Sequence, residues 1–204
     1  MQSSALTIFA ACVLAATTIN ALPLSDSTLL RPGICPGSPA AIHAKSQLTL
    51  TFPSPCDVVA ELVFSRATSD SWIDPHNGGN YTLLSDNRPS TILMSRAAGS
   101  QAKTPKGPNY DDQVKFTFLP TENWGRPDGG CQVRACSESH VTSVLDFGTN
   151  YCNMHDLICK DPAYCGKTPS NYSYTEEVDS CGTLGVNCKN SVESTCLKLK
   201  QPSV

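Results

Sequence analysis

The chain has 204 residues, 11 cysteines and a formal net charge of -3, and 40% of its residues are apolar. This length fits one domain, and this apolar content excludes a disordered chain. The slightly acidic balance gives no electrostatic reason to expect nucleic acid or an anionic membrane as a partner, so we predict neither.

Residues 1–21 have the pattern of a secretory signal peptide. They carry no charged side chain, an apolar run extends from Ala5 to Ala16, and the small residue Ala21 precedes the expected cleavage site. The stretch is too short and too rich in threonine to span a bilayer. We therefore predict a secreted, extracellular protein without a transmembrane segment, in which residues 22–34 form an N-terminal extension.

Residues 35–135 are predicted to form an antiparallel β domain. Strand-like segments, in which apolar residues alternate with polar ones or run together, occur at 48–52, 81–84, 91–94, 114–118 and 131–135. The turn-rich break at 86–89 predicts a hairpin, while 58–64 fits a strand or a helix and 97–112 fits a long exposed loop. We therefore predict a mainly β fold, an antiparallel meander folded as a sandwich or an open barrel.

Residues 136–204 are predicted to form a cysteine-rich segment that packs on the β domain and contains one short helix. Either Thr149 or Asn150 is suited to cap this helix, which would extend to Ile158. Beyond Cys165 the chain is rich in turn residues, up to a short helix or strand at 191–199.

The cysteines predict disulfide bonds. Signal-peptide cleavage would remove Cys12 and leave ten, an even number that fits five disulfides. Zinc sites usually contain close C-x-x-C pairs, and the sequence has none. The connectivity is open, although proximity in the sequence suggests Cys35 with Cys56. Eight of the ten lie between residues 131 and 196, so we expect disulfides to replace a separate hydrophobic core there. The predicted disulfide cysteines are Cys35, Cys56, Cys131, Cys136, Cys152, Cys159, Cys165, Cys181, Cys188 and Cys196.

Two sequons predict N-linked glycosylation. They are Asn80-Tyr81-Thr82 and Asn171-Tyr172-Ser173, with Asn80 and Asn171 as the acceptors. Both are compatible with passage through a secretory pathway, which agrees with the predicted location.

One segment suggests enzymatic chemistry. The string Cys152-Asn153-Met154-His155-Asp156 resembles the C-x-x-H-D motif of secreted phospholipases A2. The resemblance implies His155 as the general base to a water and Asp156 as a calcium ligand. The chain lacks the glycine-rich calcium loop of that family, and Glu177 or Asp179 would have to supply the second carboxylate. The alternative is a solvent-facing His–Asp pair without a catalytic role.

Other polar clusters fit structural roles better than a cofactor site. A metal site would have to combine Asp74, His76, Glu138, His140 and His155, but none of these has the paired spacing of metal ligands, so we predict no metal and no other cofactor. The segment Asp74–Gly79 has the composition of a structured turn. Its second interpretation is a ligand-contacting loop, formed by Trp72, Asp74, His76 and Asn77. Aromatic residues at 72, 81 and 124 fit either stacking on a sugar ring or filling a core.

Three strings resemble a family of secreted cysteine-rich proteins of oomycetes and other eukaryotic microbes. They are Trp72–Asn77 with Gly79–Leu83, Cys136–Ser139 and Thr149–Cys159, and the resemblance covers about residues 35–196. It implies a location rather than a chemistry, because such proteins often act on a host as effectors or elicitors, a virulence role.

Together these observations favour a protein that binds rather than catalyses. The sequence contains no G-x-S-x-G, P-loop or H-E-x-x-H motif, so we do not predict an enzyme. Our hypothesis is a secreted effector, elicitor or binding protein whose partner is an extracellular protein or a glycan at a host or cell-wall surface. The alternatives are a calcium-dependent phospholipase A2-like hydrolase that uses His155, and a structural wall or coat protein.

Overall fold

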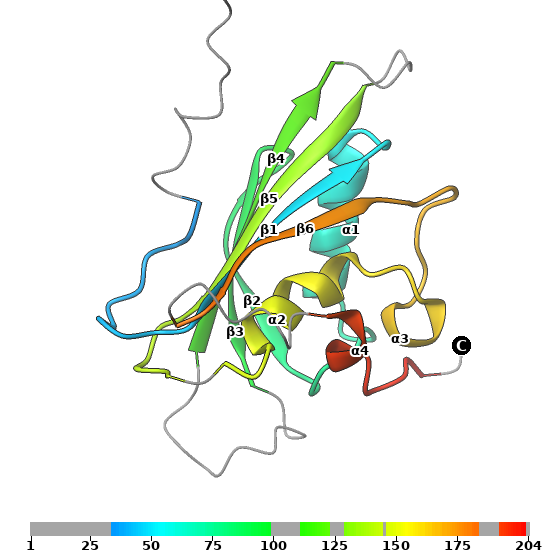
Figure 1. The fold of residues 1–204 in the computed structure, drawn as a ribbon. Helices are drawn as coiled ribbons and strands as arrows, with labels where there is room; N and C mark the ends of the chain where they lie inside the picture. The colour runs from blue at the N-terminus through cyan, green and yellow to red at the C-terminus, as the bar shows by residue number, and fades with distance from the viewer. Residues whose placement is uncertain (1–33, 99–110, 123–128, 145, 184–191, 203–204) are drawn as a thin grey trace, which may run out of the picture. The chain divides into compact units, whose positions relative to one another are not determined.

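The computed structural model describes residues 34–98, 111–122, 129–144, 146–183 and 192–202. The chain from Pro32 to Val204 forms one compact unit. Its centre is a single six-stranded antiparallel sheet, with helices packed against it (Figure 1). The prediction of a mainly antiparallel β fold is therefore confirmed.

Four consecutive strands form a meander, and two further strands extend it. The order across the sheet is β2-β3-β4-β5-β1-β6, and every neighbouring pair is antiparallel. β2 and β6 are consequently the two edge strands. The predicted hairpin at 86–89 connects β2 to β3. The strands are β1 (Lys45–Phe52), β2 (Asn80–Asn87), β3 (Thr91–Ala97), β4 (Asp111–Thr121), β5 (Gly130–Ser139) and β6 (Thr175–Gly182).

The helices are α1 (Cys56–Thr68), α2 (Thr149–Ile158), α3 (Pro162–Cys165) and α4 (Glu193–Cys196). The ambiguous segment 58–64 belongs to α1, because Val59, Leu62 and Val63 have helical spacing and are all buried. The helix predicted to end at Ile158 is α2, but its N-cap position is Gly148 rather than Thr149 or Asn150. α3 and α4 add two single-turn helices to the cysteine-rich segment.

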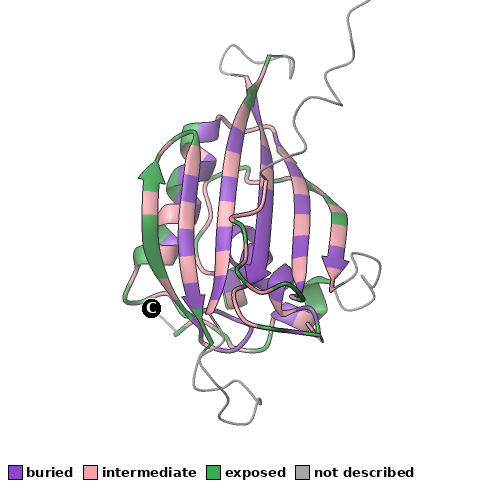
Figure 2. Ribbon diagram, turned by 90° about the vertical axis from the view of Figure 1, so that its left-hand side faces the viewer, coloured by how far each residue is buried: buried purple, intermediate pink, exposed green. Residues whose placement is uncertain are grey.

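The hydrophobic core lies between one face of the sheet and the helices α1 and α2. Buried residues alternate with less buried ones along the strands, which Figure 2 shows as alternating bands. The second layer is therefore helical, whereas a sandwich would have a second sheet. Core residues include Leu48, Leu50, Phe52, Ile92, Met94, Val114, Phe116 and Val133 of the sheet, Val59, Ala60 and Val63 of α1, and Met154, Leu157 and Ile158 of α2.

Disulfides join elements that are far apart in the sequence. The bonds are Cys35–Cys136, Cys56–Cys131, Cys152–Cys196 and Cys159–Cys165. Cys181 is also disulfide-bonded, and Cys188 lies outside the described residues. The expected pair Cys35–Cys56 was wrong. Because β1 runs antiparallel to β5, the cysteines before and after β1 lie near opposite ends of it and meet different cysteines of β5.

The cysteine-rich segment contributes a strand that the sequence did not indicate. β6 pairs with β1, although Val178 is the only aliphatic residue among its alternating half-buried positions. β5 crosses the expected boundary at residues 135 and 136, so the residues on both sides of it share one sheet. No helix in the described ranges is long and apolar enough to cross a membrane. The expected loop at 97–112 lies mostly outside the described residues.

Candidate functional site

Helix α2 is buried on all sides and carries polar residues into the interior. Every residue from Asn150 to Ile158 is buried, including Asn153, His155 and Asp156. Buried polar groups are costly unless they are paired. The partners of these side chains therefore determine what each can do, and the three face different surroundings.

His155 lies between carboxylates of two different elements. Its side chain is 3% exposed, and its Nδ1 atom is 3.1 Å from Oε2 of Glu176 on β6. The hydroxyl of Tyr151 donates to the other oxygen of Glu176 at 2.6 Å and lies 3.2 Å from the same ring nitrogen. On the opposite side of the ring, Nε2 is 3.7 Å from Oε1 of Glu193 on α4. Burial alone would raise the pKa of Glu176, but the hydrogen bond from His155 lowers it below its ordinary value.

The two carboxylates that face His155, Glu176 and Glu193, are therefore different from the two expected ones. Glu177 is exposed, and Asp179 accepts a hydrogen bond from Thr49 at 2.7 Å. The correct residue is Glu176, because the half-buried side of β6 faces α2 and the exposed side does not. Alternation along β6 would have been the signal, if that strand had been recognised.

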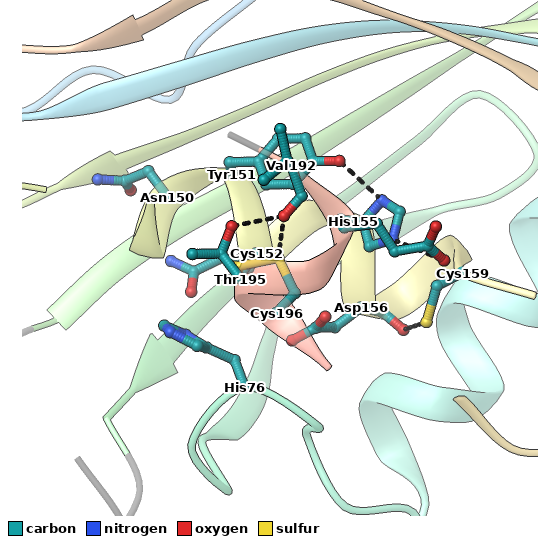
Figure 3. Close-up of a disulfide and its surroundings, with 12 residues drawn as sticks. His76, Asn150, Tyr151, Cys152, His155, Asp156, Cys159, Val192, Thr195 and Cys196 are labelled. Carbon is teal, nitrogen blue, oxygen red and sulfur yellow. Dashed lines mark hydrogen bonds and ion pairs between the residues drawn. A yellow bond between two sulfur atoms is a disulfide. The ribbon is translucent and has the colours of Figure 1, made fainter. Parts of the chain in front are cut away.

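Asp156 does not act with His155. Figure 3 shows the ring of His155 and the carboxyl group of Asp156 pointing to different sides of α2. Asp156 is completely buried. Burial raises the pKa of Asp156 well above its ordinary value, and the nearby negative charge of Asp74 raises it further. The surroundings therefore favour the protonated form of this carboxyl group, which makes it a poor ligand for calcium.

Asp74 is the centre of a buried cluster of hydrogen bonds in the loop that precedes β2. Two nitrogens of Arg96 donate to its Oδ2 at 2.9 and 2.7 Å, and the backbone N–H groups of His76 and Asn77 donate to its Oδ1 at 2.8 and 3.1 Å. The side chains of Arg96 and Asp74 are 1% and 0% exposed. Gly79 covers the guanidinium, and a Cβ atom at Gly79 would come within 2.6 Å of it. The string around Asp74 is therefore a structured turn.

The same geometry removes most of the expected ligand-contacting loop from the surface. Asp74, His76 and Asn77 are all buried. Trp72 is half-buried, and its indole N–H donates to the carbonyl oxygen of Cys165 at 3.1 Å. A ligand-contacting role for this loop stays a prediction, and the part exposed to a ligand would be small.

A network of amide side chains joins α2 to the sheet, and the sequence did not reveal it. Asn153 donates to Asp112 at 2.8 Å and to Ser137 at 3.0 Å, and Ser137 donates to Asn150 at 2.7 Å. Asn150 also donates to Asp146 at 2.9 Å. Burial raises the pKa of Asp146 to about 6. These contacts fix the position of α2 on β4 and β5.

The other expected site residues lie apart. Glu138 is 3.1 Å from His43, and neither it nor His140 joins His76 and His155 in one cluster. Over the described ranges, no group of three His, Cys, Asp or Glu side chains is placed to hold a metal ion. Asn80 and Asn171 are both exposed. Trp124 lies outside the described residues.

Two open pockets lie beside α1. One has a volume of about 420 Å³ and is lined by Asp57, Glu61, Asp86, Arg88 and Pro89. The other has a volume of about 550 Å³ and is lined by Asp57, Val58, Glu61, Leu62, Ser65 and Pro169. Neither includes a residue of α2, so the polar side chains of α2 do not line them.

The outer face of the sheet presents a row of polar side chains. The strand register places Thr91, Thr117, Arg134, Thr49 and Glu177 side by side across β3, β4, β5, β1 and β6. Arg134 is half-buried at the centre, and among the described residues it forms no ion pair. α1 and α2 lie against the other face (Figure 1). Figure 2 views this outer face, and described residues that precede β1 pass over part of it. We call these five residues the outer row.

The architecture supports a limited statement about identity. A small chain with several disulfides and an antiparallel sheet is compatible with a secreted, non-enzymatic protein. No protein-family model matches the chain, and no curated protein or solved structure is significantly similar to it.

Proposed function

We propose that this chain is a secreted, non-enzymatic binding protein that recognises a hydroxyl-rich polymer, such as a glycan of a cell wall or a host surface, through the outer row. The observation that supports this proposal is a line of hydroxyl and charged groups across five strands, on a sheet face that no described helix covers. By contrast, the histidine best placed for general-base catalysis, His155, is only 3% exposed.

The chemistry of the outer row suits a polar, extended ligand. Neighbouring strands are about 4.8 Å apart, so the row presents hydroxyl groups at regular short intervals. The hydroxyl of Thr49 donates to Asp179, so it is an acceptor for a ligand, while Thr91 and Thr117 can donate as well. Arg134 adds a planar group with several N–H donors, which favours a carboxylate or a ring of sugar hydroxyls. Because strands hold these side chains in place, little conformational entropy is lost on binding.

This proposal also accommodates a role at a host surface. The family resemblance implies secreted proteins of microbes that act as effectors or elicitors, and recognition of a surface glycan is a first step such a protein needs. In this proposal the row makes the contact, and the disulfides keep the sheet rigid outside the cell.

Glycan arrays and sedimentation with insoluble polysaccharides test the proposal. The variants are Thr117→Val, which removes a hydroxyl at constant shape, and Arg134→Gln. Each should weaken binding roughly tenfold, since one or two hydrogen bonds of about 1 kcal/mol are lost. The matched control is Arg88→Gln, because Arg88 lies beside α1 on the other side of the molecule. Unchanged binding by both row variants would place the contact elsewhere.

A second candidate is the phospholipase A2-like hydrolase, favoured by the 3.1 Å contact between His155 and Glu176. A His–carboxylate pair is the arrangement a general base needs, but this ring is 3% exposed. Phospholipid hydrolysis should be absent with and without a chelator. Turnover that the chelator and His155→Gln both abolish would establish the hydrolase. A structural wall protein would instead resist extraction from the wall by mild buffers.

A further inference from the structure

The two edges of the sheet are protected to different degrees. An edge strand exposes unpaired backbone groups, and proteins usually protect it with charges, bulges or covering segments. β6 carries the exposed carboxylates of Glu177 and Asp179. β2 has one acidic residue, Asp86, and Arg88 pairs with it at 2.9 Å. The edge formed by β2 is therefore much less charged.

The first half of β2 has the least protection. A bulge interrupts its pairing with β3 between Leu83 and Ser85, so the twisted and charged part of the strand begins there. Before the bulge, residues 80–83 contain no charged side chain. Leu83 and Leu84 are 37% and 49% exposed. An uncharged edge with two exposed leucines can pair with the same edge of a second molecule.

Asn80 is the first residue of this unprotected stretch, and it is the acceptor of a sequon. Its side chain is exposed, as is that of Thr82, the third residue of the sequon. The rise of a strand places Leu83 about 10 Å from Asn80 along β2. Asn80 lies on the outer face of β2, whereas Leu83 pairs with the buried Met94 and lies on the core face. A branched oligosaccharide attached at Asn80 would therefore lie along the free edge on the outer face, close to the bulge at Leu84.

We propose that an N-linked glycan on Asn80 shields the edge of β2 and keeps the protein monomeric. The inference uses the proposed passage through the secretory pathway but not the proposed glycan-binding outer row. In the modification, the amide nitrogen of Asn80 bonds to the anomeric carbon of an oligosaccharide carried on a lipid pyrophosphate. The carbon–oxygen bond to the pyrophosphate breaks, the lipid pyrophosphate leaves with the electron pair, and the amide proton goes to a base.

Two substitutions at Thr82 separate the glycan from the side chain. Thr82→Ser keeps a sequon and Thr82→Ala destroys it, while Asn80 itself is unchanged in both. The full chain is secreted from glycosylating eukaryotic cells. Mass spectrometry should find Asn80 modified in the wild type and in Thr82→Ser only. Light scattering should show roughly tenfold stronger self-association for Thr82→Ala. Asn171→Gln, which removes the other sequon, should leave the protein monomeric.

Two further measurements keep the proposal falsifiable if Thr82→Ala folds poorly. Trimming the wild-type glycan to a single sugar with an endoglycosidase should cause the same association without any substitution. Adding Leu83→Lys to Thr82→Ala should restore the monomer, because a charge now protects the edge. An unmodified Asn80 in the secreted protein would overturn the proposal, and so would a trimmed protein that stays monomeric.

Discussion

Asp74 and Asp156 are two carboxyl groups buried near each other, and their partners give them opposite charge states. Burial alone would raise the pKa of Asp74, but Arg96 and the backbone donor of Asn77 lower it below the ordinary value. Arg96 also lowers the pKa of Asp156, but burial and the negative charge of Asp74 outweigh this effect and raise it. The interior therefore favours the carboxylate form of Asp74 and the protonated form of Asp156.

The raised pKa of Asp156 predicts a pH-dependent stability. The unfolded chain releases this proton near pH 4 and the folded chain only at a much higher pH. Between these two values the folded state holds more protons, so stability falls as the pH rises. Asp156→Asn lacks this dependence and can donate its amide N–H to Asp74. Urea unfolding should show the variant gaining stability over the wild type from pH 5 to pH 8. The exposed control Asp70→Asn should show no such trend.

Removing one partner of the buried pair Arg96–Asp74 should be costly. Arg96→Met leaves an uncompensated carboxylate in the interior, and we expect a loss of about 3–5 kcal/mol in the free energy of unfolding. The double variant Asp74→Asn with Arg96→Met should recover much of this loss, because no buried charge is left. Urea unfolding of the two single variants and the double variant measures the coupling. If Arg96→Met lowered the free energy of unfolding no more than Arg88→Met at the surface, the buried Arg96–Asp74 cluster would not stabilise the fold.

Gly79 allows the loop to pack closely against the Arg96 guanidinium in the same cluster. Because a Cβ atom would come within 2.6 Å of the Arg96 guanidinium, Gly79→Ala has to displace that group or the loop. We expect lower thermal stability with an unchanged fold. Circular dichroism during heating measures it, and a melting temperature equal to that of the wild type would show that the loop moves freely.

At the scale of elements, two of the disulfides close loops of very different length. Cys56–Cys131 spans 75 residues and Cys159–Cys165 spans 6. In the chain-entropy description, these loops correspond to about 4.5 and about 2 kcal/mol. Replacing each pair by alanines should therefore cost more for the first. Urea unfolding of the two double variants compares them, and equal losses would show that the chain-entropy description does not hold here.

The sequence predicted elements where burial produces a clear period and failed where it does not. The strands at 48–52 and 114–118 were recognisable because one side of each is apolar and buried. β6 was missed because its inward positions include Glu176, whose partner His155 is itself polar. The segment 58–64 was ambiguous because a short apolar run fits both the helical period and the strand period. Tertiary contacts decide such cases, and a single sequence does not contain them.

At the scale of the whole molecule, the cysteine-rich segment is part of the sheet and the hydrophobic core rather than an addition to the surface. α2 supplies Met154, Leu157 and Ile158 to the core, and β6 pairs with β1. The sequence did not predict the disulfide partners or the contact between Asp74 and Arg96. In both cases the sheet topology brings together residues that are distant in the sequence. The number of cysteines was enough to predict that they form disulfides. It was not enough to predict which cysteines pair.

A truncated chain tests this interdependence. Residues 35–135 alone lack α2, β6 and the end of β5, so one side of their core is exposed to water. We expect this fragment to remain unfolded, whereas residues 34–204 should unfold in one cooperative transition. Near-ultraviolet circular dichroism and amide NMR spectra distinguish the two outcomes. A fragment with a dispersed spectrum would show that the β domain folds independently.

The complete burial of α2 also determines how the sequence can change over evolutionary time. Surface helices accept many replacements on their solvated side, but residues 150–158 of α2 have no solvated side. Among any relatives of the chain, drift should therefore be slowest across Asn150–Cys159 and at Asp74 and Arg96, and fastest in the outward positions of β2. A profile weighted on those interior polar residues should detect remote kin sooner than one weighted on the number of cysteines.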